Sequence, residues 1–492
     1  GANNTAVGYA AGTAITTGAY NTAVGVDALK TNTTGHTNTA IGYHALRLNT
    51  TGYHNVAIGA SDNSSVGAAL GANTEGRNNI AIGRGALKSN TTGKNNVAVG
   101  DDALGSNTTA DKNTAVGRNS LDANTEGHSN TAVGESSLTG NTTGDRNVAI
   151  GQNAMAVNST GSQNVAIGRN ALDANTTADD NVAVGDGAAT SNTTGTNNTA
   201  VGSLALQDNQ TGLANTAIGH SALQSSTGTA NTVVGADAAK NTTSGTLNTV
   251  VGKDAFFTNT TGQRNIAIGF AAMELSNGSY NTAMGYNALG DNDDDANVAI
   301  GYQAMDTATG ADSCVAIGTE ALRSTTGDDN IAIGRYAMNT AGTGGQNTVV
   351  GYQAGKVITS GSSNVIMGQR AGLDLTTGST NTFVGPRAGQ NITTASNNTA
   401  VGVDALEDAT TAADNTCIGT NAGANLTSGS NNLLLGKEAG KSGSPGGQFT
   451  SHSNRVVLGN GNIQELNCEV ALSVASDERD KTDFTDLDIG LD

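Results

Sequence analysis

The chain repeats one short motif at a nearly constant interval. The unit Asn-Thr/Val-Ala-Val/Ile-Gly begins at Asn4 and returns 17 residues later at Asn21. This spacing continues to Asn432, with a few intervals of 16. Its 26 starting positions are Asn4, Asn21, Asn38, Asn55, Asn79, Asn96, Asn113, Asn130, Asn147, Asn164, Asn181, Asn198, Asn215, Asn231, Asn248, Asn265, Asn281, Asn297, Cys314 (in the Asn place), Asn330, Asn347, Asn364, Asn381, Asn398, Asn415 and Asn432. A period this short predicts a parallel β-solenoid with one repeat per rung.

The first five residues of a repeat alternate as a strand does. Thr22 and Val24 share one face, and the small residues Ala23 and Gly25 share the other. Small residues at the same place in every rung indicate that something approaches closely there. Either a neighbouring chain or the opposite wall of the solenoid meets this requirement.

The rest of the repeat predicts a second short strand and a turn. Ala28-Leu29 is the candidate strand, and the segment from Asn32 to Gly35 has turn chemistry because Asn and Gly tolerate positive φ. Gly and β-branched residues in every unit argue against helices. A stack of 26 rungs at about 4.8 Å each is roughly 125 Å long.

One interval is longer than the others. Asn55 and Asn79 are 24 residues apart instead of 17, so this repeat has seven extra residues, which we place between Gly59 and Ala69. Inserted residues in a solenoid leave the stack as a surface loop.

The composition favours thin layers over a globular core. Aromatic residues make up 3% of the chain, Trp is absent and 68 residues are Gly. Ordering 17 residues costs about 25 kcal/mol, yet each rung offers only three or four small apolar side chains. We therefore expect several chains to pack along a common axis.

Charge and hydropathy exclude two classes of partner. A net charge of -19 does not suit a phosphate backbone, so we predict no nucleic-acid binding. No run of about 18 apolar residues occurs, so we predict no membrane insertion.

The strand motif resembles that of trimeric autotransporter adhesin heads, Asn-Ser/Thr-Val/Ala-Ala-Ile-Gly, and it is closer still to the longer repeats of phage tail-fibre proteins. The likeness covers residues 1–440. It implies an all-β fold, a left-handed parallel β-roll, assembled as an elongated homotrimer. The 17-residue unit is longer than the adhesin-head repeat.

Two further segments follow the shaft of residues 1–440. Residues 441–475 are predicted to be a connector with short strands, one of them at Val456-Val457-Leu458. Residues 476–492 resemble the truncated beginning of the endosialidase-type intramolecular chaperone of phage tail spikes and fibres. In that family the chain cuts itself before the Ser of a Ser-Asp-Glu-Arg-x-Lys motif.

The resemblance assigns Ser476 as the nucleophile, Lys481 as its base and the bond from Ala475 to Ser476 as the scissile bond. A hydroxyl needs a base to become a good nucleophile, and a partly desolvated Lys can serve. The alternative is a helix N-terminus capped by Ser476, with two acids in the first turn. A trimerising chaperone has a physical purpose here, because identical rungs can pair out of register at little cost.

Other polar groups predict neither a metal nor a cofactor. The acidic cluster from Asp291 to Asp295 lies in a turn and is expected to be a solvated loop, not a Ca²⁺ site. Cys314, Cys417 and Cys468 are expected to be small buried side chains. Six residues directly follow a rung Gly and are expected to pack along an edge in preference to forming a sugar platform: Tyr9, Tyr43, Phe270, Tyr286, Tyr302 and Tyr352.

The leading hypothesis is therefore a structural shaft of a viral tail fibre, extracellular on the virion and not an enzyme beyond one self-cleavage. Its partners would be itself and a host cell-surface receptor, which could be a glycan, bound through a tip or the fibre surface. A bacterial trimeric surface adhesin stalk on the cell surface is the first alternative. An ice-binding β-solenoid is the second, and it would need Thr-x-Thr on its strands.

Overall fold

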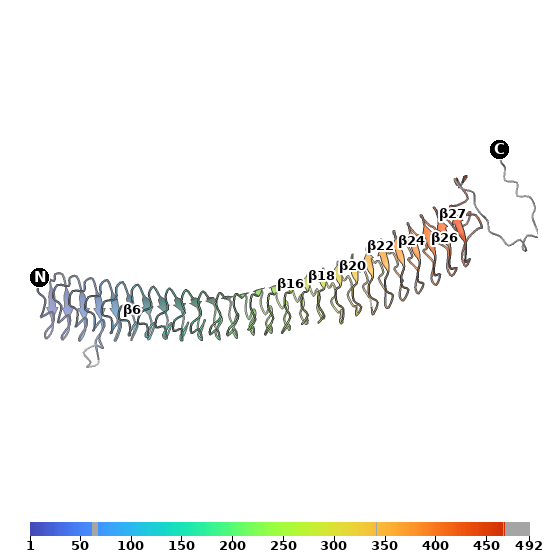
Figure 1. Cartoon of the computed structure of the whole chain (residues 1–492). Helices are drawn as coiled ribbons and strands as arrows, with labels where there is room; N and C mark the ends of the chain where they lie inside the picture. Colours follow the sequence, from blue (N-terminus) through green and yellow to red (C-terminus); the bar gives the residue numbers. More distant parts are fainter. Residues whose placement is uncertain (62–66, 341, 466, 468–492) are drawn as a thin grey trace, which may run out of the picture.

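The computed structural model describes residues 1–61, 67–340, 342–465 and 467, and these form a long, gently curved rod with the N-terminus at one tip and β27 (Val456–Leu458) near the other (Figure 1). Each repeat contributes one three-residue strand to a single parallel sheet of 27 strands. The strands are β1 Thr5–Val7, β2 Thr22–Val24, β3 Thr39–Ile41, β4 Val56–Ile58, β5 Ile80–Ile82, β6 Val97–Val99, β7 Thr114–Val116, β8 Thr131–Val133, β9 Val148–Ile150, β10 Val165–Ile167, β11 Val182–Val184, β12 Thr199–Val201, β13 Thr216–Ile218, β14 Thr232–Val234, β15 Thr249–Val251, β16 Ile266–Ile268, β17 Thr282–Met284, β18 Val298–Ile300, β19 Val315–Ile317, β20 Ile331–Ile333, β21 Thr348–Val350, β22 Val365–Met367, β23 Thr382–Val384, β24 Thr399–Val401, β25 Thr416–Ile418, β26 Leu433–Leu435 and β27 Val456–Leu458. The predicted parallel β-solenoid of 17-residue rungs is confirmed.

Every strand pairs with the next one in the chain, residue for residue. Thr22 lies opposite Thr39, and the same register continues across the long interval, where Val56 lies opposite Ile80. Ser61 still donates to the Tyr43 carbonyl, and Gly85 to the Gly67 carbonyl. The extra residues therefore lie in the predicted place, and 62–66 are outside the described residues.

The small face of each strand is the interior of the solenoid. Ala23 is buried, whereas Thr22 is half-buried and Val24 is exposed on the outside. The close approach predicted from Ala and Gly is thus to the opposite wall of the same chain, where Ala28 and Leu29 complete the core. At Gly25, with φ of 131°, an added Cβ would lie 2.5 Å from the Gly42 carbonyl oxygen of the next rung. Stacking therefore requires glycine here.

The prediction of a second strand at Ala28-Leu29 is wrong. Asp27 and Leu29 have φ of 58° and 52°, and this alternation of left-handed residues replaces an extended strand with stacked turns. Neighbouring rungs still bond through these turns, since Leu29 donates its N–H to the Ala45 carbonyl at 3.0 Å. The polar turn predicted from Asn32 to Gly35 is present.

Two asparagine ladders run through the interior. At the first, Asn38 donates its backbone N–H to Asn21 Oδ1 at 3.0 Å and its Nδ2 to the Gly52 carbonyl at 2.9 Å, so one side chain position joins successive rungs. At the second, Asn49 Nδ2 donates to Asn32 Oδ1 at 2.7 Å and to Gly52 O at 2.9 Å. Fully satisfied buried amides lock one rung to the next.

The second ladder changes character along the rod. It is Asn from Asn32 to Asn209, and its place is apolar in later rungs, at Ile358, Leu375, Ile392 and Leu426. In these four rungs the Leu three residues earlier becomes Gly355, Gly372, Gly389 and Gly423. At Gly389 an added Cβ would lie 2.9 Å from the Phe383 ring, so the missing side chain makes room for the larger core residues.

Candidate functional site

The most extensive candidate site is the outward side of the sheet, which we call the outer face. Side chains alternate along each three-residue strand, so its first and third residues form two outward columns, and the exposed residues before the rung Asn and after the rung Gly flank them as two more. In the rung of β2 they are Tyr20, Thr22, Val24 and Val26. The columns of Thr22 and Val24 are the inner columns, and those of Tyr20 and Val26 are the outer columns.

The inner columns form an apolar strip along the whole rod. The third strand residue is Val, Ile, Leu or Met in all 27 described strands, and many of these side chains are more than a third exposed. The exposed members are Val7, Val24, Ile41, Ile58, Ile80, Ile82, Val116, Ile150, Ile167, Ile218, Val251, Ile266, Met284, Ile317, Ile331, Ile333, Val365, Met367, Ile418, Val456 and Leu458. The two columns together form a strip about 125 Å long and about 7 Å wide that covers roughly 850 Å², and Thr begins 14 of the 27 described strands, so part of this area is polar.

The outer columns are mostly polar. In the column after the rung Gly, successive rungs pair charges, with Arg118 2.6 Å from Glu135 and Arg169 3.0 Å from Asp186. The Arg169 guanidinium holds the pKa of Asp186 below its ordinary value through a hydrogen bond. Such exposed pairs contribute little to stability. An apolar centre between polar margins is nevertheless the usual anatomy of a protein interface.

The aromatic residues after the rung Gly stack where they occupy consecutive rungs. Phe270, Tyr286 and Tyr302 have ring centroids 5.4 Å apart, with interplanar angles of 9° and 14°. The rings cover one another's faces and present their edges to solvent. Ring faces inside the stack are covered, whereas a sugar platform would need open ring faces; edge packing of the six residues stays a prediction.

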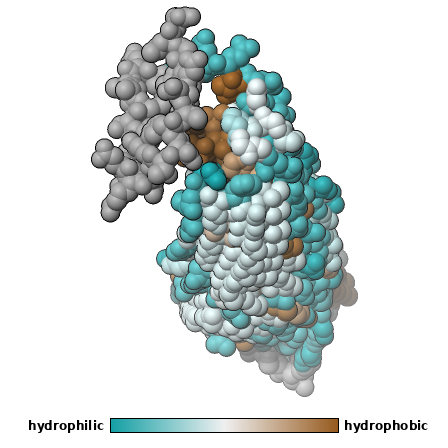
Figure 2. Space-filling view, turned by 90° about the vertical axis from the view of Figure 1, so that its right-hand side faces the viewer, coloured by the Kyte–Doolittle hydropathy of each residue, from teal (hydrophilic) through white to brown (hydrophobic). Residues whose placement is uncertain are grey.

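The C-terminal end of the rod also exposes apolar side chains. Figure 2 views the rod from this end and shows them gathered there, above regular rows of residues of intermediate hydropathy. Val456 is 68% exposed and Ile463 53% exposed. β27 pairs with β26, so the sheet continues past the loop of residues 441–455.

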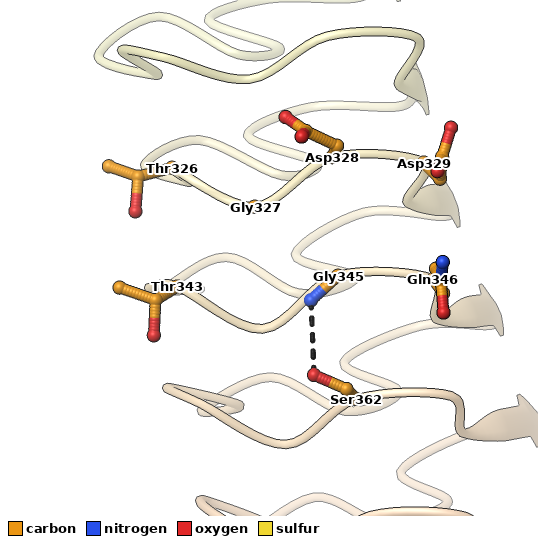
Figure 3. Close-up of a pocket in the computed structure, with 8 residues that line it drawn as sticks. All are labelled: Thr326, Gly327, Asp328, Asp329, Thr343, Gly345, Gln346 and Ser362. Carbon is orange, nitrogen blue, oxygen red and sulfur yellow. Dashed lines mark hydrogen bonds between the residues drawn. The ribbon is translucent and has the colours of Figure 1, made fainter.

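A polar hollow of about 300 Å³ lies on the turn edge of the rod (Figure 3). It opens where Gly345 has no side chain, in a column in which other residues cap backbone groups. Asp312 donates its N–H to Asp328 Oδ1 at 3.0 Å, and Gly345 donates its N–H to Ser362 Oγ at 3.3 Å. The hollow holds two aspartates and no nucleophile with a base, so it offers no catalytic arrangement.

Aspartates of the acidic turn from Asp291 to Asp295 accept hydrogen bonds from backbone N–H groups. Asp293 and Asp295 are exposed and accept N–H groups of the preceding rung at 2.8 and 2.7 Å, while Asn292 is buried. Within residues 1–61, 67–340, 342–465 and 467, no group of three or more His, Cys, Asp or Glu side chains could hold a metal ion. The same residues include no helix of the length and hydropathy that a membrane crossing requires.

Two of the three cysteines are described, and both are buried and free, as predicted. Burial raises the pKa of Cys314 to about 11 and that of Cys417 to about 12, so both thiols are neutral and unreactive near neutral pH. Cys468 lies outside the described residues.

The residues assigned to self-cleavage, Ser476 and Lys481, lie outside the described residues, as does the bond from Ala475 to Ser476.

The ice-binding hypothesis needs Thr-x-Thr on the strands, and none of the 27 described strands has it. The inward direction of the Asn side chains was missed in the sequence. Their place directly before each strand, two residues before the inward residue, was the available signal because residues two apart share a face.

These features define an all-β repeat protein, a parallel β-solenoid of about 17 residues per rung with interior asparagine ladders. Its elongated shape is consistent with a structural fibre. No protein-family model matches the chain, and no curated protein matches it.

Proposed function

We propose that this protein is the structural shaft of a viral tail fibre, in which copies of the chain pack through their outer faces. The observation that carries the proposal is the uninterrupted apolar column at the third strand position, which follows the rod from β1 to β27 beside a column of Thr, Val, Ile and Leu. A flat strip of roughly 850 Å² per chain is comparable to one side of a standard stable interface, about 800 Å². Three such faces can enclose a common axis, and the resemblance implies a homotrimer.

Association supports the mechanical role. Each rung has a thin core of Ala, Leu and Asn, so a single rod gains little from side-chain burial. Copies that share the inner columns remove their Val and Ile side chains from water along the whole length. A stiff, extracellular, water-soluble spacer with an acidic surface follows, and its task is to hold a receptor-binding tip away from the virion.

The oligomeric state tests this proposal directly. We expect sedimentation of the full chain to give three times the mass of one chain. Ile150→Asp with Ile167→Asp places two charges on the inner columns and should shift the protein to monomers. Thr160→Asp with Thr177→Asp adds the same charges on the exposed turn edge of the same rungs and should leave the trimer intact. A monomeric wild type would overturn the proposal.

We further propose that the C-terminal segment aligns the chains and then cuts itself away. Lys481 would take the proton of the Ser476 hydroxyl, whose oxygen would attack the Ala475 carbonyl carbon and break the peptide bond, leaving an ester and a free amine. Water would hydrolyse the ester and release the Ala475 carboxylate. This is one turnover and not an enzymatic activity on another substrate.

Mass spectrometry of the full-length product tests the cleavage. Wild type should end at Ala475, whereas Ser476→Ala and Lys481→Ala should keep the C-terminal segment. Ser473→Ala is the matched control and should be cut like wild type. Identical masses for wild type and Ser476→Ala would remove the cleavage step and leave the shaft proposal standing.

Alignment by the chaperone has a separate test. After cleavage the trimer would be trapped kinetically. We therefore expect the cleaved rod, once denatured, to refold without its chaperone into few aligned trimers. Full recovery would show that the shaft aligns itself.

The alternative of a bacterial trimeric adhesin stalk uses the same association of copies. A secretion signal upstream would favour it, and a tail-attachment domain upstream would favour the virus. The host receptor, including a glycan, would bind at a tip or on the surface of either fibre.

A further inference from the structure

We propose that the outer face has one anchor point for a second copy of this chain, formed by Leu247, Phe270, Tyr280, Tyr286 and Tyr302. This rests on the proposed packing of copies through the outer face. It adds which part of the face holds the copies most tightly and limits how far they can slip along each other.

The first observation is the width of the apolar surface. In this segment, large apolar side chains also stand in the two outer columns, next to the inner ones. Phe270, Tyr286 and Tyr302 stand in the column after the rung Gly, and each is between 44% and 49% exposed. In the opposite outer column Leu247 is 50% and Tyr280 56% exposed. Arg264 lies between Leu247 and Tyr280 in this column, and Lys253 precedes Phe270 in the other, so within this segment large apolar side chains occupy both outer columns together only in the rung of β17.

The inner columns between them are also exposed. Val251, Ile266 and Met284 lie in the same rungs, on β15, β16 and β17, and are 37–40% exposed. The unbroken aromatic column and the inner columns beside it thus form one patch on the outer face. A wide, water-excluding centre is the place where interfaces concentrate their binding free energy.

The second observation is that the rings are already held in place. Phe270, Tyr286 and Tyr302 stack on one another, and Lys253 Nζ lies 5.4 Å from the centroid of the Phe270 ring. On the other margin Arg264 lies 5.3 Å from the centroid of the Tyr280 ring. Ordered aromatic side chains lose little conformational entropy when a partner covers them.

The stacking also decides what kind of partner fits. Since the ring faces are covered by neighbouring rings, a sugar could contact only the edges of the stack. A flat apolar surface with the same rung spacing of about 4.8 Å matches the patch along its whole length. The outer face of another copy is such a surface, and it is continuous with the proposed interface on both sides.

The patch has a consequence for alignment. Elsewhere the inner columns repeat Thr, Val and Ile, so a slip by one rung changes few contacts. The aromatic stack occupies only the three consecutive rungs of Phe270, Tyr286 and Tyr302. Copies that slip by several rungs place these rings against Thr and Val and lose the aromatic contacts on all chains.

The test compares two triple variants of the full chain. Phe270→Ser, Tyr286→Ser and Tyr302→Ser remove the stack. Val157→Ser, Leu213→Ser and Leu275→Ser remove three apolar side chains that are 46–51% exposed outside the outer face. We expect the first set to raise the dissociation constant of the assembly by at least about a hundredfold. The second set should leave it within about threefold of wild type.

Two further readouts complete the test. Electron micrographs should show rods with flush ends for wild type and the control, and rods with staggered ends for the stack variant. Tyr286→Phe with Tyr302→Phe keeps the rings and should retain both wild-type properties. Circular dichroism confirms that each variant keeps its β-structure.

The outcomes separate this inference from the one on which it rests. A monomeric wild type would end the packing of copies altogether. A stack variant that assembles as tightly as wild type, with flush ends, would overturn the anchor and leave that packing in place. A stack variant that assembles normally but loses glycan binding would also overturn it, in favour of a recognition site.

Discussion

At the scale of the residue, the buried asparagine at the start of each repeat has the most demanding role. Asn130 Oδ1 accepts the Asn147 N–H at 2.9 Å, and Asn130 Nδ2 donates to the Gly144 carbonyl at 2.8 Å. A buried amide without these partners would lose about 1–3 kcal/mol per unsatisfied group. The ladder therefore stabilises a rung only when its neighbour is already in place.

A natural interruption of this ladder inside the rod gives the first prediction. Cys314 takes the Asn place and contacts the Gly327 carbonyl at 3.4 Å through Sγ, a weak donor. Cys314→Asn would supply a strong donor to this carbonyl and an acceptor for the next rung, so we expect a gain of about 1 kcal/mol. Denaturant unfolding measures it, with Cys314→Ala as the control. Equal stability of the two variants would contradict the role of the ladder.

The thiols give a second prediction at this scale. Burial raises the pKa of Cys314 to about 11 and of Cys417 to about 12, so neither carries a reactive thiolate at about pH 8. In a Cys468→Ser background we expect no alkylation of the folded rod and two alkylated sites after denaturation, counted by mass spectrometry. Because ionisation favours the unfolded chain, this contribution to stability is present below about pH 9 and is lost as the pH rises above it. Rapid alkylation of the folded rod near pH 8 would place these thiols at the surface.

At the scale of the element, each rung balances three interior positions. In most rungs they are Ala on the strand, Leu in the first turn and Asn in the second, as at Ala115, Leu121 and Asn124. In later rungs the strand residue grows, the turn Leu becomes Gly and the Asn becomes Ile or Leu. Conserving the volume of the rung keeps the packing dense while the chemistry of the core changes.

This balance predicts that a single Asn cannot replace an apolar residue in a column whose neighbouring rungs are apolar. Leu375 lies in a column between Ile358 and Ile392, so Leu375→Asn would bury an amide with no ladder partner and destabilise these rungs by about 3 kcal/mol. Leu375→Met keeps the volume and should cost less than about 1.5 kcal/mol. Hydrogen exchange over residues 364–392 reports the local loss. Equal protection in both variants would show that the column tolerates unpaired amides.

At the scale of the whole molecule, the rod combines a strongly acidic surface with a continuous apolar face. The net charge is -19, and the ion pairs on the surface link neighbouring rungs of one chain, such as Arg84 with Asp101 at 2.8 Å. Like charges on different copies oppose association, whereas the apolar strip favours it. The two effects respond differently to salt.

We therefore expect the assembly to tighten as the salt concentration rises to about 1 M. Salt screens repulsion between the acidic copies and leaves hydrophobic burial in place. Sedimentation at low and high salt measures the change. As a control, Arg118→Gln removes one exposed pair and should not alter the oligomer. Dissociation at high salt would mean that the charged outer columns hold the copies together.

The repeat interval determined the architecture without any coordinates. Spacing of 17, the alternation of Thr22, Ala23 and Val24, and the Gly after each strand suffice to predict a parallel stack with one rung per repeat, because identical units can all be satisfied only by identical neighbours. The position of the extra residues between Gly59 and Ala69 follows from the same interval, and the burial of Cys314 and Cys417 was predicted from the small number and wide spacing of the cysteines. The Ser476 prediction rests on resemblance alone.

Only the tertiary structure decided which face of each strand points inward and which backbone conformation the turns adopt. Sequence alternation cannot say which face is inside, and the inward face here is the small one because the opposite wall of a thin coil leaves space for Ala23 and no more. The predicted strand at Ala28-Leu29 became a turn since Asp27 and Leu29 adopt positive φ, a conformation held by bonds between rungs. Inter-rung contacts form only after stacking, so the amino-acid pattern defines the rung and the stack defines its shape.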